Sequence, residues 1–131
     1  MRSTAREIVF KYIFSKLFNP DDEGLFTVML KGAKLSEDKE LFATDLYNAV
    51  INNFDAYLEK IESITPSYRS DRIFAADKCA IMIGMAEFDN FKETPVPVII
   101  NEAVNLSAKF STEKSTDFVN GVLAEYVKTE R

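Results

Sequence analysis

The 131-residue chain contains no histidine, so it lacks the side chain that most often serves as a general base or a metal ligand near neutral pH. Its single cysteine, Cys79, has no partner for a disulfide within the chain and no histidine to activate it as a nucleophile. The four glycines are scattered and form no phosphate-binding loop. We therefore predict a protein with no catalytic residue, metal or cofactor, in which Cys79 is a buried apolar residue.

Carboxylates are abundant and leave one other route to chemistry. Asp71, Asp77 and Glu87 would suit an acid pair or a divalent-cation site, but their spacing is irregular. The simpler interpretation, which we favour, is that Asp71 caps a helix and that Asp77 lies on a surface facing solvent or a partner.

Long apolar runs are also missing, although 47% of the residues are hydrophobic. No stretch approaches the ~20 apolar residues that cross a membrane. Near the amino terminus, Glu7 occupies a position where a secretory signal needs apolar residues. These features predict a single domain located in the cytoplasm.

Positive charge is scarce: the formal net charge is −5, and both halves are mildly acidic. Holding a nucleic-acid backbone by electrostatics alone requires clustered lysine and arginine. Any binding of nucleic acid by this chain must therefore be local or shared with another molecule.

Helical signals run along the whole sequence. Thr4 and Glu7 have the spacing of a capping box, which predicts a helix that begins near Ala5 and ends before Asn19-Pro20. A short second helix follows and ends at Gly32. The apolar residues expected on the buried sides of these two helices are Val9, Phe10, Ile13, Leu17, Leu25, Phe26, Met29 and Leu30.

The longest helical pattern runs from Ser36 to Pro66, and we expect one helix that crosses the domain. After Thr65-Pro66-Ser67, residues Ser70-Asp71 cap a stretch that is either one helix or two with a bend. Two closing helices follow. Pro97 is expected in the first turn of one, and Ser115 or Thr116 is expected to cap the other.

No segment alternates like a β-strand, so the predicted fold is all-α. We expect a compact domain of about seven helices in two small packed bundles, residues 1–66 and residues 67–131. The same apolar faces could close a monomer or a homodimer, and the sequence leaves that choice open.

Six short motifs are distributed along the chain: Ala5-Arg6-Glu7, Asp71-Arg72-Ile73, Asp77-Lys78, Glu87-Phe88, Asn101-Glu102-Ala103 and Phe118-Val119-Asn120-Gly121-Val122-Leu123. Together they resemble the motifs of the NusB family. The resemblance implies a helical antitermination factor that pairs with the ribosomal protein NusE, binds boxA RNA and supports transcription of ribosomal operons by the elongation complex.

The resemblance further implies an RNA surface made of Arg2, Arg6, Lys109, Phe110, Lys114, Phe118 and Asn120. Each has another interpretation. Arg2 and Arg6 either contact phosphates or remain in solvent. Phe118 either stacks on a base or packs in the core, and Asn120 either reads a base edge or ties its helix to a loop. Gly121 is expected to allow close helix packing rather than to touch RNA.

The implied partner surface is Asp71, Arg72 and Asp77, where acidic groups would meet a basic protein. The amino-terminal segment has fewer arginines than is usual in the family, whereas Lys114 replaces an acidic residue of some relatives. We therefore expect weak RNA binding by the chain alone. One alternative is a helical protein-interaction module without useful RNA binding. Another is the accessory domain of an RNA cytosine methyltransferase, which is disfavoured because the chain ends at Arg131.

Overall fold

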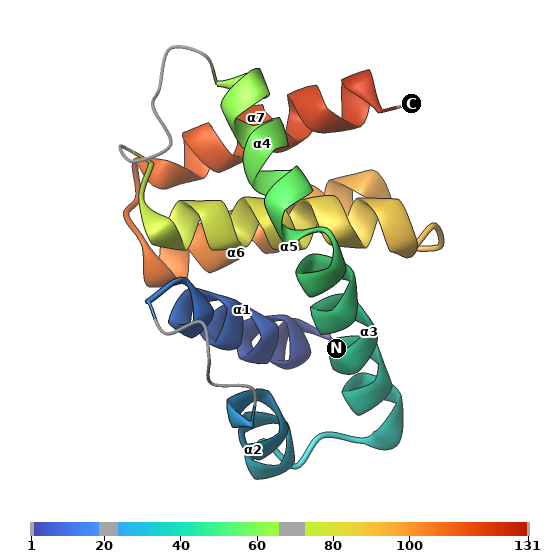
Figure 1. The fold of residues 1–131 in the computed structure, drawn as a ribbon. Coiled ribbons are helices and arrows are strands. Elements are labelled where there is room, and N and C mark those ends of the chain that lie inside the picture. The colour runs from blue at the N-terminus through green and yellow to red at the C-terminus, as the bar shows by residue number, and fades with distance from the viewer. Residues whose placement is uncertain (1, 19–23, 66–72, 131) are drawn as a thin grey trace.

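The computed structural model describes residues 2–18, 24–65 and 73–130, in which the chain forms seven α-helices and no strand (Figure 1). This confirms the predicted all-α class. The helices are α1 (Ser3–Phe18), α2 (Leu25–Gly32), α3 (Glu37–Asn52), α4 (Phe54–Ile64), α5 (Ala75–Asn90), α6 (Val96–Phe110) and α7 (Ser115–Thr129). None of them combines the length and the apolar character of a membrane span.

Two helix starts follow the predicted capping chemistry. At α3 the Ser36 hydroxyl accepts a hydrogen bond of 3.4 Å from the Lys39 amide, and acidic residues fill the first turn. At α6 the residue before the helix is Pro95, and Pro97 lies in the first turn, where a missing amide costs nothing. Ser36 and Pro95 therefore directly precede the first residues of α3 and α6.

The expectation of a single helix from Ser36 to Pro66 is wrong. The chain breaks between α3 and α4 at Asn53, whose backbone has φ −123° and ψ 18°. The Asn53 side-chain amide donates a 2.9 Å hydrogen bond to the Ala49 carbonyl. An asparagine side chain that bonds to the backbone in this way competes with the hydrogen bonds of a helix. The apolar residues keep helical spacing on both sides of Asn53, and their pattern therefore did not reveal the break.

Two other predicted caps also differ from the structure. The first helix begins at Ser3 rather than near Ala5, so Thr4 and Glu7 lie inside it and form no capping box. Ser115 is the first residue of α7 and is buried, and its amide donates to the Thr112 hydroxyl at 3.2 Å. A hydroxyl three residues before Ser115 therefore serves the start of α7.

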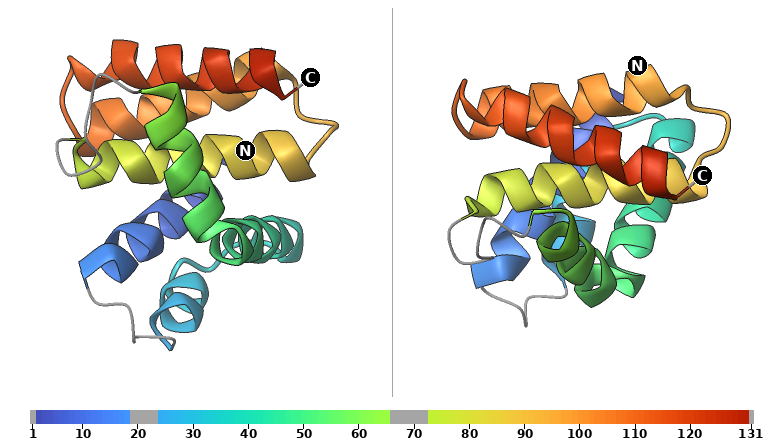
Figure 2. Two further views of the ribbon diagram at one scale, coloured as in Figure 1. Left: turned by 45° about the horizontal axis from the view of Figure 1, so that its top comes forward. Right: turned by 90° about the horizontal axis from the view of Figure 1, so that it is seen from above.

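Helix α5 lies at the centre of the molecule. It packs against α1, α3, α4, α6 and α7, and Figure 2 shows it crossed by helices on several sides. Residues 79–87 are buried without interruption, so α5 is buried on all its faces. From Ala75 to Asn90 it is one helix, so Ile73 and Phe74 precede it, and the predicted cap at Ser70-Asp71 lies outside the described residues.

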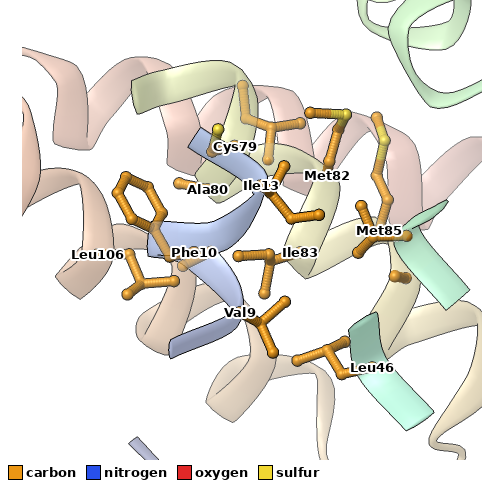
Figure 3. Close-up of a cluster of buried hydrophobic side chains, with 14 of the residues drawn as sticks. Val9, Phe10, Ile13, Leu46, Cys79, Ala80, Met82, Ile83, Met85 and Leu106 are labelled. Carbon is orange, nitrogen blue, oxygen red and sulfur yellow. The ribbon is translucent and has the colours of Figure 1, made fainter. Parts of the chain in front are cut away.

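The hydrophobic core is continuous and draws on both halves of the chain (Figure 3). Val9 and Ile13 of α1 meet Ile83 of α5, and Leu46 of α3 and Leu106 of α6 close the cluster from two sides. The division into residues 1–66 and 67–131 stays a prediction. Cys79 is buried as predicted, and burial raises the pKa of its thiol to about 12.

Close packing in the carboxyl-terminal half depends on Gly84 rather than on Gly121. A Cβ added at Gly84 would lie 2.7 Å from a methyl carbon of Leu123, whereas a Cβ at Gly121 would meet nothing within 4 Å. The expected packing role of Gly121 is therefore wrong. A side chain at Gly84 would force the buried Leu123 side chain of α7 to move.

Candidate functional site

Four helix ends gather at one edge of the molecule. The carboxyl ends of α1 and α6 and the amino ends of α5 and α7 lie together in Figures 1 and 2. We call this region the candidate edge. It contains the predicted site residues Asp77, Lys109, Phe110, Lys114 and Phe118, together with Phe74.

Arg6 does not belong to the surface. It is 4% exposed, and its Nε and Nη2 donate hydrogen bonds of 2.8 and 2.6 Å to the carboxylate of Glu87. Its Nη1 lies 3.6 Å from a carboxylate oxygen of Glu102, which also accepts a hydrogen bond from Ser3. Both interpretations considered for Arg6 required a surface position, so both are corrected: Arg6 ties α1 to α5 and α6.

Arg2 lies at the far end of α1 from the candidate edge. Its guanidinium carbon is 4.3 Å from the centre of the Phe42 ring, and Nη1 is 3.9 Å from a carboxylate oxygen of Glu93. The side chain is 35% exposed. Both amino-terminal arginines thus lie over the Phe42 ring, but Arg2 is partly exposed whereas Arg6 is buried.

An aromatic ring flanked by lysines lies beside the middle of α1. Phe110 stacks on the buried Phe10 with ring centres 4.8 Å apart. The ammonium nitrogens of Lys11 and Lys109 lie 5.8 and 5.5 Å from the centre of the Phe110 ring. A rigidly held ring beside two ammonium groups suits a nucleotide, whose base stacks and whose phosphate is anionic. Sequence reasoning missed Lys11.

Phe118 and Asn120 face different grooves. Residues two apart on a helix do not face each other, and the structure separates these two accordingly. Phe118 borders a groove with Phe74 and Asp77, whereas the exposed Asn120 borders another groove with Asn101, between α6 and α7. The predicted RNA residues therefore do not form a single cluster.

Asp77 occupies the groove beside Phe118. Its side chain is 4% exposed, and Oδ1 is the one buried side-chain oxygen or nitrogen of the described residues without a hydrogen-bond partner. The groove measures about 670 Å³, and Phe74, at 59% exposure, forms part of its wall. An unpaired carboxylate beside an exposed aromatic ring suits a basic and apolar occupant.

The carboxylates once considered as an acid pair are separated. Asp77 and Glu87 lie near opposite ends of α5, about 15 Å apart at 1.5 Å per residue. Within the described ranges, no three side chains of the metal-ligating types gather around a common point. Asp71 and Arg72 lie outside the described residues.

A third carboxylate of α5, Asp89, holds two tyrosines that sequence reasoning did not connect. The hydroxyls of Tyr57 and Tyr126 donate to Asp89 Oδ2 at 2.7 and 2.8 Å. Burial and these hydrogen bonds raise the pKa of both tyrosines above the ordinary range. The arrangement ties α4 and α7 to α5 and has a structural role.

Comparisons with known proteins agree with the fold and with the motifs. The family model described as the NusB family matches residues 3–128. The transcription antitermination protein NusB of Natranaerobius thermophilus is 32% identical, with 93% of this chain and 91% of that protein covered. The NusB protein of Methylacidiphilum infernorum is also 32% identical, with 97% and 90% covered.

Solved structures match over nearly the full length. The complex of antitermination factors NusB and NusE with dsRNA is similar with a TM-score of 0.82 and 26% identity, covering 98% of this chain and 96% of that one. NusB of T. maritima matches with a TM-score of 0.87 and 23% identity, covering 98% and 91%, and this likeness supports the fold alone. Because the family model spans almost the whole chain and relatives above 30% identity cover nine-tenths of it, the chain belongs to the NusB family.

Proposed function

We propose that this chain is a transcription antitermination factor that binds boxA-type RNA together with the small-subunit ribosomal protein NusE. It would act in the cytoplasm, within the elongation complex, and support transcription of ribosomal RNA operons. Family membership supports the proposal, because relatives over 30% identical are named transcription antitermination proteins. A related structure, 26% identical, contains NusB and NusE with dsRNA.

The observation in this chain that carries the proposal is the unpaired carboxylate of Asp77 in its groove. A basic side chain of a protein partner would supply the missing hydrogen bonds, and Phe74 would pack against its apolar part. The net charge of −5 favours a basic partner such as a ribosomal protein. We therefore place the NusE-binding surface at Asp77 and Phe74.

RNA binding is proposed for the side of the candidate edge that carries Lys109, Phe110 and Lys114. Lys114 is exposed and borders the groove of Asp77, so bound RNA would lie next to the protein partner. Phe118 borders the same groove, and Asn120 stays a candidate for contact with a base edge. Few cations are exposed here, so NusE must supply part of the phosphate contact.

The test is fluorescence anisotropy with a labelled boxA oligonucleotide and a scrambled one, each with and without purified NusE, across a salt series. Tight binding that requires both NusE and the boxA sequence is the expected result. Sedimentation of the free chain and of the complex measures whether a monomer or a homodimer takes part. Formation of the NusE complex without discrimination between the two RNAs would support the interaction-module alternative instead.

Charge removal at Lys109 and Lys114 separates RNA binding from partner binding. The double variant Lys109→Gln and Lys114→Gln should weaken RNA binding by the complex and flatten its salt dependence. Binding of NusE should change less than RNA binding, because Lys114 only borders the groove of Asp77 and Lys109 lies outside it. Replacing Arg6 cannot serve this purpose, since it breaks a buried ion pair. Unchanged RNA affinity in the double variant would count against the RNA surface proposed here.

A further inference from the structure

Glu7 pairs with one of the two lysines that lie beside the Phe110 ring. We define the lysine platform as Lys11, Lys109 and Phe110. The Lys109 ammonium lies 2.6 Å from Oε1 of Glu7, although the Lys109 side chain is 60% exposed. In the free protein, one of the two cations of the platform is thus already neutralised by a carboxylate from α1.

Glu7 pairs with Lys109 of α6 although Lys11 lies on its own helix. Glu7 precedes Lys11 by four residues on α1, a spacing that commonly brings a glutamate and a lysine together. Instead, the carboxylate reaches across to α6 and pairs with Lys109. Within the described residues, exposed Lys11 has no carboxylate at ion-pair distance, and its ammonium lies near the Phe110 ring. The platform therefore holds one occupied and one available ammonium group.

We propose that Glu7 competes with RNA for Lys109, and that Lys11 is a further RNA-binding residue of this chain. The phosphate of a nucleotide whose base stacks at Phe110 would displace the Glu7 carboxylate from the Lys109 ammonium. Lys11 would meet the same nucleotide without any displacement. This inference rests on the proposed function, because it concerns the same RNA.

The ion pair is weak enough to be exchanged. Exposed lysine–carboxylate pairs contribute about 0.2–1 kcal/mol, which corresponds to at most about a fivefold change in affinity. Glu7→Gln removes the competing charge and leaves Lys109 in place, so RNA binding becomes stronger. The Phe110 ring stays in position, because stacking on the buried Phe10 holds it.

The experiment measures anisotropy of boxA RNA with NusE for Glu7→Gln and for a matched control, Glu59→Gln. Glu59 is an exposed glutamate of α4, so both variants raise the net charge equally. We expect Glu7→Gln to tighten RNA binding by about two- to fivefold, and Glu59→Gln to change it less. An equal effect of the two variants would overturn the inference by reducing it to overall charge.

A double-mutant cycle tests whether Glu7 acts through Lys109. The gain from Glu7→Gln should disappear when Lys109 is already Gln, and a gain that persists in that background contradicts the competition. Lys11→Gln should weaken binding by about two- to fivefold, whereas Lys128→Gln, at the exposed end of α7, should not. Equal effects of the two lysine variants would remove Lys11 from the site.

Wild-type binding distinguishes the two levels of failure. If the wild type with NusE does not discriminate boxA from scrambled RNA, the proposed function fails and the competition fails with it. If the wild type discriminates but Glu7→Gln binds no more tightly, only the competition fails. NusE affinity and thermal unfolding, measured on each variant, should match those of the wild type, since these side chains lie outside the core.

Discussion

Asp77 and Glu87 lie ten residues apart on α5, and their side chains are 4% and 1% exposed. Glu87 accepts two hydrogen bonds from Arg6, and these hold α1 against α5. Asp77 lines a groove and keeps one oxygen without a partner. Burial alone therefore does not distinguish the carboxylate that ties two helices together from the one proposed to bind a partner. The hydrogen-bond partners of their oxygens distinguish them.

The largest effect on stability is expected at Glu87, whose carboxylate is paired with Arg6. Arg6→Ala leaves the Glu87 carboxylate buried and unpaired, and should lower the free energy of unfolding by about 3–5 kcal/mol. Denaturant unfolding followed by circular dichroism measures this. The double variant Arg6→Met and Glu87→Leu should recover most of the loss, because an apolar pair needs no charge compensation. A loss below about 1 kcal/mol for Arg6→Ala would contradict the structural role.

The middle of α5 gives the next largest effect. Gly84→Ala forces a Cβ against Leu123 and should cost about 1–3 kcal/mol of stability. Gly121→Ala is the matched control in α7: the Cβ has open space, and alanine favours a helix by about 1 kcal/mol over glycine. The two melting temperatures should therefore move in opposite directions. Equal shifts of the two melting temperatures would contradict a close contact between Gly84 and Leu123.

Tyr57 and Tyr126, which bind Asp89 near the carboxyl end of α5, should contribute less to stability, and their contribution should depend on pH. Tyr126→Phe removes one hydrogen bond to Asp89 and should cost about 1 kcal/mol near neutral pH. The folded-state pKa of this hydroxyl is raised above its unfolded value of about 10. Its contribution is therefore complete below pH 10 and is lost as the pH rises further. Wild type and variant should converge in stability on going above pH 10.

The smallest effect on stability is expected at the unsatisfied end. Asp77→Asn removes a charge that has an unpaired oxygen, so stability should change by less than about 1 kcal/mol and in the direction of a gain. Binding of NusE should nevertheless weaken by about tenfold or more, because a charged partner loses its counter-charge. Calorimetry measures both, with the exposed Asp55→Asn of α4 as control. Loss of stability without loss of NusE binding would assign a structural role to Asp77 in place of the proposed role in partner binding.

Sequence periodicity predicted much of the fold, because apolar residues at helical spacing mark buried faces directly. Five apolar residues predicted on the buried sides of the first two helices are buried in the structure: Val9, Phe10, Ile13, Phe26 and Leu30. The break at Asn53 was not predictable in this way. The apolar spacing continues through it, and the interrupting hydrogen bond comes from one polar side chain.

The candidate site was harder to predict, since it depends on which polar groups meet across helices. Arg6 reads as an exposed cation in the sequence, and its partner Glu87 lies 81 residues away. Lys11 and Phe110 are likewise far apart in sequence. Spacing within one helix reveals such neighbours only when both belong to that helix. The RNA and partner assignments, which came from family resemblance, stay predictions.

The contact between Arg6 and Glu87 also has a consequence for synthesis of the chain. At about 5–20 residues per second, roughly 4 to 16 seconds separate translation of Arg6 from that of Glu87, and Glu102 follows later. During that interval Arg6 of α1 lacks the Glu87 carboxylate that pairs with it in the folded protein. The final packing of α1 against α5 therefore requires that α5 has been synthesised.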